Sequence, residues 1–133
     1  MTRFAIDTLT ALRLVQEGVT VPDSHQLVAP NVLRSRVMSH LYRGVRSGEL
    51  SGDAAHVQLN RLTSVRVRLL GDRVSRAVAW KVAELFDWED TTNAEFVAVA
   101  KLQADAFITL DPELARQVEG IVTIAPFDAL RAQ

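Results

Sequence analysis

The sequence of 133 residues contains no cysteine. The chain therefore forms no disulfide and offers neither a thiolate ligand for zinc nor a thiol nucleophile. It also lacks any apolar run approaching the roughly 20 residues that span a bilayer, and no basic segment precedes a signal-like apolar stretch. These absences favour a cytoplasmic protein with no membrane partner.

Several sequence motifs of catalysis and nucleotide binding are missing as well. No glycine-rich loop followed by Lys-Ser or Lys-Thr is present, which excludes a P-loop, and neither G-x-S-x-G nor G-x-G-x-x-G occurs. The three histidines, His25, His40 and His56, lack metal-ligand spacing and fall in different expected elements. We interpret them as surface or boundary residues.

Charge is unevenly distributed along the chain, although the formal net charge is only −1. Residues 31–81 carry ten basic against three acidic side chains, and residues 82–133 carry three basic against ten acidic, which gives +7 and −7. The basic stretch could contact phosphates, an acidic partner or the acidic third of the same chain. Solvated helix faces with internal charge pairing are the simpler interpretation.

Alternating strand-like and helix-like segments predict the fold. Strands are expected at residues 3–7, 26–29, 63–69, 106–110 and 121–124. Helices are expected between them, with Gly18 as a C-cap, Asp72 as an N-cap and a capping box formed by Thr92 and Glu95. Helices between strands imply mainly parallel pairing. We therefore expect residues 1–133 to form a single domain, a three-layer α/β/α sandwich with a mainly parallel central sheet.

Two of the expected strands end in an aspartate. Asp7 follows the first apolar run, and Asp111 follows the run at residues 107–110. The carboxyl ends of parallel strands border the crevice where open α/β sheets bind ligands, and two carboxylates there could hold a divalent cation. Each aspartate also has a structural interpretation, because it can cap the helix that follows it.

Four stretches resemble, in their order and spacing, the PIN domain, the small nuclease fold of VapC-type toxins in bacterial toxin–antitoxin pairs. They are the opening strand ending at Asp7, residues 27–37 (similar to "APxLLxxEV"), residues 70–83, and residues 92–100 followed by 106–111 (similar to "DAxxxAxA … lvTxD"). The resemblance covers nearly the whole chain. It implies an RNA-cleaving site in which three or four carboxylates hold Mg²⁺ or Mn²⁺, because a hard cation activates water and stabilises phosphorane charge.

The acidic pattern implied by the resemblance is incomplete in this chain. Asp7 and Asp111 remain, but Arg36 stands in place of the helix acid and Asn93 in place of the acid of the late helix. An amide oxygen brings no charge to a catalytic or metal site, and a nearby guanidinium opposes cation binding or could pair with the remaining acids. Binding of Mg²⁺ or Mn²⁺ is therefore expected to be weak or absent, unless Glu89, Asp90 or Glu95 compensates.

The resemblance also suggests how RNA would bind. Arg34, Arg36 and Arg43 would guide it to the site, and Thr109 would contact a phosphate or a metal-bound water. One hypothesis is a metal-dependent ribonuclease whose activity is weak or lost, with an antitoxin protein and a second copy of the chain as partners. The alternatives are a non-catalytic PIN-like module that binds RNA or protein, and a self-associating structural or regulatory module. A response-regulator-like fold is disfavoured because Asp7 stands alone after its strand.

Overall fold

The computed structural model describes residues 1–132. Four parallel strands, in the order β3-β2-β1-β4, form its central sheet. Their bounds are Thr2–Ile6 (β1), His25–Pro30 (β2), Val67–Leu70 (β3) and Ala106–Ile108 (β4). The helices are Thr8–Glu17 (α1), Leu33–Arg46 (α2), Gly52–Ser64 (α3), Arg73–Leu85 (α4), Thr92–Gln103 (α5) and Pro112–Val118 (α6), followed by the 3-10 helix Phe127–Leu130 (η1).

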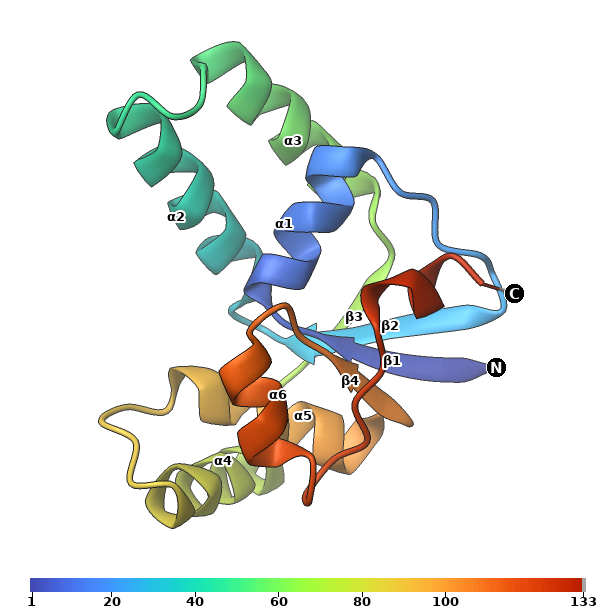
Figure 1. Cartoon of the computed structure of the whole chain (residues 1–133), viewed down its shortest axis with the longest axis vertical. Helices are drawn as coiled ribbons and strands as arrows, with labels where there is room; N and C mark the ends of the chain where they lie inside the picture. Colours follow the sequence, from blue (N-terminus) through green and yellow to red (C-terminus); the bar gives the residue numbers. More distant parts are fainter. Residues whose placement is uncertain (133) are drawn as a thin grey trace.

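Helices cover both faces of the sheet, so the architecture is the three-layer α/β/α sandwich that the sequence predicted. Figure 1 shows α1, α2 and α3 on one side of the strands and α4, α5 and α6 on the other. No helix within residues 1–132 is both long enough and apolar enough to cross a membrane.

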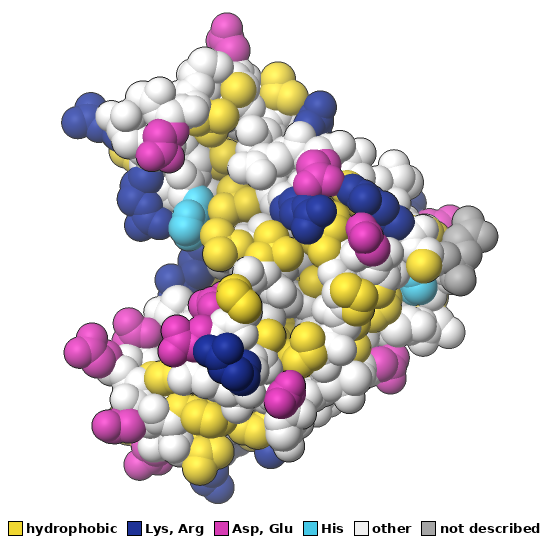
Figure 2. Space-filling view, viewed as in Figure 1, with side chains coloured by type: hydrophobic (Ala, Val, Ile, Leu, Met, Phe, Trp, Pro, Cys, Tyr) yellow, Lys and Arg dark blue, Asp and Glu magenta, His cyan; other side chains and the backbone are white. Residues whose placement is uncertain are grey.

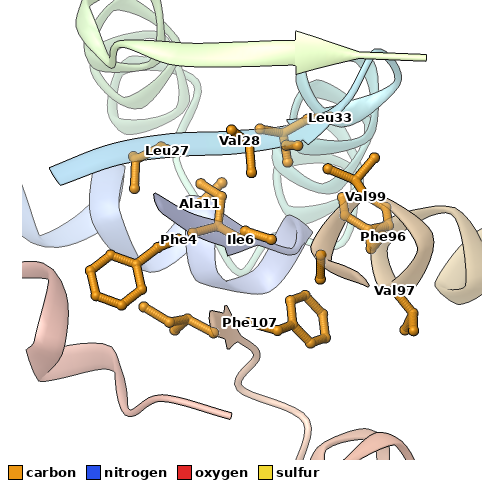
Figure 3. Close-up of a cluster of buried hydrophobic side chains, with 14 of the residues drawn as sticks. Phe4, Ile6, Ala11, Leu27, Val28, Leu33, Phe96, Val97, Val99 and Phe107 are labelled. Atoms are coloured by element: carbon orange, nitrogen blue, oxygen red, sulfur yellow. The ribbon is translucent and has the colours of Figure 1, made fainter. Parts of the chain in front are cut away.

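The hydrophobic core lies between these layers because the strands are apolar on both faces. Ile6 and Val28 from the two central strands are buried, as are Leu33 of α2 and Val97 of α5. Figure 3 shows these side chains with Phe107 of β4 in one cluster. Packing of α2 and α5 into this core from opposite sides of the sheet fixes both helices relative to the ends of β1 and β4, where the candidate site lies.

Several helix ends follow the predicted local chemistry. Gly18 closes α1 in the left-handed region, with φ of 62°, where a side chain is disfavoured. Asp72 begins α4 in a reciprocal capping box with Ser75. Asp7 and Asp111 cap α1 and α6 through their side chains. The capping interpretation of both aspartates is therefore confirmed.

Two of the expected strands differ markedly from the structure. The strand predicted at residues 63–69 begins only at Val67, because α3 continues to Ser64 and the pairing of β3 with β2 starts at Leu27 and Val67. The strand predicted at residues 121–124 is reduced to one parallel bridge between Phe107 and Ile124.

The predicted capping box at the start of α5 is also wrong. The N-cap is Thr91, one residue earlier than expected, and it makes no side-chain cap hydrogen bond. The backbone N–H of Thr92 instead donates to the carboxylate of Asp90 at 3.0 Å. Glu95, predicted to complete the box, is left free of that role and lies half-buried on the next turn.

Candidate functional site

The candidate site lies where the connections of the sheet change direction. From β1 the chain proceeds to β2 and β3 on one side, whereas β4 lies on the other side of β1. The gap beyond the carboxyl ends of β1 and β4 is thus the topological switch point, where open parallel sheets bind ligands. Asp7 directly follows β1, and Asp111 lies three residues after β4.

Asp7 is fixed from several directions and is only 8% exposed. Its Oδ1 accepts a hydrogen bond from the backbone N–H of Thr10 at 2.9 Å and lies 2.7 Å from the hydroxyl of the same residue. Its Oδ2 accepts a hydrogen bond from the hydroxyl of Thr109. Both carboxylate oxygens therefore already serve the fold, which lowers their availability to an incoming ligand.

Asp111 is held in a related but more open way. Its Oδ1 accepts from the backbone N–H groups of Glu113, at 3.0 Å, and Leu114, at 3.2 Å, at the first turn of α6. Its own N–H donates to the hydroxyl oxygen of Thr109 at 3.1 Å. Thr109 therefore joins the two aspartates, through the side chain of Asp7 and the backbone of Asp111.

The two aspartates border a cleft of about 460 Å³. One wall is a side of α2, and the facing wall consists of the first turns of α1, α5 and α6. Figure 2 shows the cleft as a notch between these parts, with Lys and Arg side chains along its upper rim and Asp and Glu side chains along its lower rim. The opposite charges of the two chain segments thus meet across this notch.

The α2 wall presents its basic groups from a single helix face. Arg36, His40 and Arg43 all line the cleft, at spacings of four and three residues that place them on adjacent turns. Neither arginine forms an ion pair with any residue in 1–132, and the buried Nε of Arg36 has no hydrogen-bond partner there. Arg36 thus does not pair with Asp7 or Asp111, contrary to one expectation for this residue.

Two ionisable groups report the electrostatics around this wall. Partial burial, together with the charge of Arg43, holds the pKa of His40 below its ordinary value of 6.5. The hydrogen bonds from Thr92 lower the pKa of Asp90 from its ordinary value, and the positive charge of Arg36 lowers it further. The field of Arg36 therefore reaches the N-terminus of α5 across the cleft.

The structure brings together most of the site residues that the sequence singled out. Asp7, Asn93, Asp111, Arg36 and Arg43 all line the one cleft, although Asp7 and Asp111 are more than a hundred positions apart in sequence.

Other expected site residues lie elsewhere. Arg34 borders a different hollow, and Thr109 is half-buried behind the aspartates. Among the acids considered as substitutes, Glu95 lines a separate pocket of about 200 Å³ with Arg76, and neither Glu89 nor Asp90 lines the cleft.

The sequence interpretation missed five polar residues of the cleft. They are Thr8 at the start of α1, Ser35, Ser39 and His40 on α2, and Thr92 at the start of α5. His40 had been interpreted as a surface or boundary residue. Its spacing from Arg36 and Arg43 was the signal that could have placed it on the same helix face.

The donor set of the cleft fits a tightly held divalent cation poorly. Within residues 1–132 no three Asp, Glu, His or Cys side chains are grouped as metal ligands. The available oxygens belong to two capping carboxylates and the amide of Asn93, and Arg36 contributes an unpaired positive charge to the same space. Hard cations favour several anionic oxygens, which this cleft does not supply.

No protein-family model matches this chain, and no curated protein matches it. The likeness to PIN domains therefore rests on the residues quoted from the sequence, and its consequences for function are proposals.

Proposed function

We propose that the chain is a PIN-like protein whose cleft binds RNA through its phosphate backbone, and that metal-dependent cleavage at this site is weak or lost. The convergence of Asp7, Asn93, Asp111 and Arg36 in one cleft carries the proposal, because these are the four positions that the PIN resemblance assigns to the site. The cleft also lies at the switch point of the sheet, the usual ligand position for such folds.

The charges of the cleft support binding of an anion. Arg36 and Arg43 have no ion-pair partners in residues 1–132, whereas the fold engages both carboxylate oxygens of Asp7 and one of Asp111. The N-terminus of α5 borders the same space, but the N–H of Thr92 there is already hydrogen-bonded to the carboxylate of Asp90. The guanidinium groups of α2 are therefore the groups that favour phosphate oxygens.

The same charges explain why cleavage would be weak. A divalent cation would have to bind beside Arg36 with two carboxylates in place of the family's three or four. We therefore assign the chain's own residues only to binding and positioning of the RNA backbone. Arg36 and Arg43 would hold phosphates, while Ser35 and Ser39 would offer hydroxyl donors from the same helix face.

A second candidate function is a non-catalytic protein-interaction module, with an antitoxin protein or a second copy of the chain as partner. The exposed apolar side chains of α4 favour it, because Val74, Trp80 and Leu85 are each at least 60% exposed. Apolar groups gathered on one element often mark a protein interface. This function is compatible with RNA binding in the cleft, and the cytoplasm is the compartment we propose for both.

The proposal is tested by measuring RNA binding of the wild type and of an Arg36→Glu, Arg43→Glu variant. Fluorescence anisotropy gives the affinity of each protein at several salt concentrations. We expect the variant to bind at least tenfold more weakly, and the slope of log affinity against log salt to fall by about 1.4 for two lost single-strand phosphate contacts. The matched control, Arg73→Glu with Lys101→Glu, makes the same charge change on exposed helix positions outside the cleft.

Cleavage is measured on the same RNA with Mg²⁺ or Mn²⁺ present. We expect at most slow cleavage, which Asp7→Asn abolishes while the capping oxygen is retained. Equal RNA affinity of the cleft variant and wild type would contradict the binding proposal, and rapid cleavage by the wild type would contradict the loss of activity.

A further inference from the structure

A second hollow lies at the opposite end of the sheet from the cleft. Two adjoining cavities of about 390 and 620 Å³ share six lining residues near the beginnings of β2 and β3. Four arginines border them, against a single acidic residue, Asp23. We call this surface the basic groove and define it by Arg34, Arg61, Arg66 and Arg68.

The arginines of the basic groove are largely free to meet a ligand. None of the four forms an ion pair with a residue in 1–132. Arg61 donates to the carbonyl oxygens of Val15 and Gln16 at the end of α1, and Arg34 makes one long contact of 3.5 Å with the carbonyl oxygen of Val65. Unpaired cations at this density favour a polyanionic partner.

The spacing of two of these arginines suits a linear array of charges. Arg68 lies in the edge strand β3 and Arg66 immediately precedes it, and both are exposed. In extended chain, side chains two residues apart point to the same side and are separated by about 6.6 Å, because successive side chains alternate. This separation is comparable with that between successive phosphates of an extended single strand.

The start of α2 connects the basic groove to the cleft. Arg34 borders the groove and Arg36 lines the cleft, although they are only two residues apart. At 3.6 residues per turn, positions two apart point to nearly opposite sides of a helix. A chain that passes around the first turn of α2 would therefore meet both surfaces.

We propose that the basic groove binds the phosphate backbone of the same single-stranded RNA that occupies the cleft, so that the RNA passes around the start of α2. This inference rests on the proposed function and extends it from one phosphate site to a longer footprint. RNA is favoured over an acidic protein segment because the arginines follow one another along a strand edge and reach the cleft through Arg34.

The test compares two RNA lengths in anisotropy measurements. Single strands of about 4 and about 16 nucleotides bracket the usual site sizes. We expect Arg66→Glu with Arg68→Glu to weaken binding of the long strand about tenfold and to lower its salt slope by about 1.4, with little effect on the short strand. The Arg73→Glu, Lys101→Glu control carries the same charge change and should bind both strands as the wild type does. Thermal melting monitors folding, and the milder Arg66→Gln, Arg68→Gln variant should show a smaller loss of affinity.

Each outcome separates this inference from the proposed function. If the groove variants bind the long strand as tightly as the wild type, while the Arg36→Glu, Arg43→Glu variant binds more weakly, the proposal for the basic groove is wrong and the proposal for the cleft stands. If only the groove variants lose binding of the long strand, RNA binding in the basic groove is supported and RNA binding in the cleft is contradicted. Sedimentation that shows a wild-type dimer converted to monomer by the groove substitutions would overturn the inference in favour of a contact with the acidic third of a second copy.

Discussion

The two walls of the cleft use their polar groups in opposite ways. On the wall formed by the first turns of α1, α5 and α6, Asp7 and Asp111 are engaged by backbone N–H groups, and Asp7 also by hydroxyls. On the α2 wall, Arg36 and Arg43 have no ion-pair partners among residues 1–132. The comparison teaches that the two aspartates of the cleft stabilise the fold, whereas the cations are available to a ligand.

The largest expected effect tests the structural role of the wall that carries Asp7 and Asp111, which we call the acidic wall. Asp7→Ala should lower the free energy of unfolding by about 3 kcal/mol, because it removes a helix cap and leaves the buried N–H of Thr10 and the half-buried hydroxyl of Thr109 without their acceptor. Asp111→Ala, at a more open cap, should cost about 1 kcal/mol. Arg36→Ala should change stability by no more than about 0.5 kcal/mol.

Urea denaturation of the three variants measures these differences. We predict that the loss of stability decreases in the order Asp7, Asp111, Arg36. The reverse order would show that the α2 wall also stabilises the fold.

A smaller effect is expected when the α2 wall is made acidic. Arg36→Glu with Asn93→Asp removes the opposing cation and places carboxylates at the two positions where the PIN pattern, which this chain resembles, has acids. Mn²⁺ affinity, measured by calorimetry, should rise about tenfold, since attraction replaces repulsion in a partly buried site.

The matched control for metal binding is Arg34→Glu with Asn60→Asp, which changes the net charge equally at exposed positions outside the cleft. If both double variants bind Mn²⁺ no more tightly than the wild type, Arg36 and Asn93 do not occupy the metal-binding positions.

The position of the two aspartates at one edge of the sheet could be predicted from the sequence. An aspartate after each of two apolar strands identifies residues at one edge of a parallel sheet, and Asp7 and Asp111 do border the same cleft. The helix caps at Gly18 and Asp72 were equally readable, because left-handed backbone and N-terminal amides have strong residue preferences.

Other features depend on tertiary contacts that periodicity does not reveal. Thr63 to Leu69 alternates like a strand, yet Thr63 and Ser64 complete α3, and pairing with β2 starts only at Val67. The end of the apolar run at 121–124 reaches β4 at only one position. The start of α5 was misplaced because Asp90, outside the expected box, takes the N–H of Thr92.

The smallest expected effect concerns pH and the histidine between the two arginines of the α2 wall. The pKa of His40 in the folded protein lies below 6.5, the value expected when the chain is unfolded. As the pH falls below 6.5, the unfolded chain therefore takes up the proton first, and stability decreases. A bound phosphate beside His40 would instead favour the imidazolium, so RNA affinity should rise a few-fold over the same pH range.

Anisotropy and thermal melting at several pH values from 8 to about 5.5 measure both trends. His40→Asn should reduce the pH dependence of both stability and RNA affinity, and should leave RNA affinity at pH 8 nearly unchanged. The control is His56→Asn, at an exposed position of α3 outside the cleft, which should keep the pH dependence of the wild type. An RNA affinity that does not increase with falling pH in the wild type would place the phosphate away from His40.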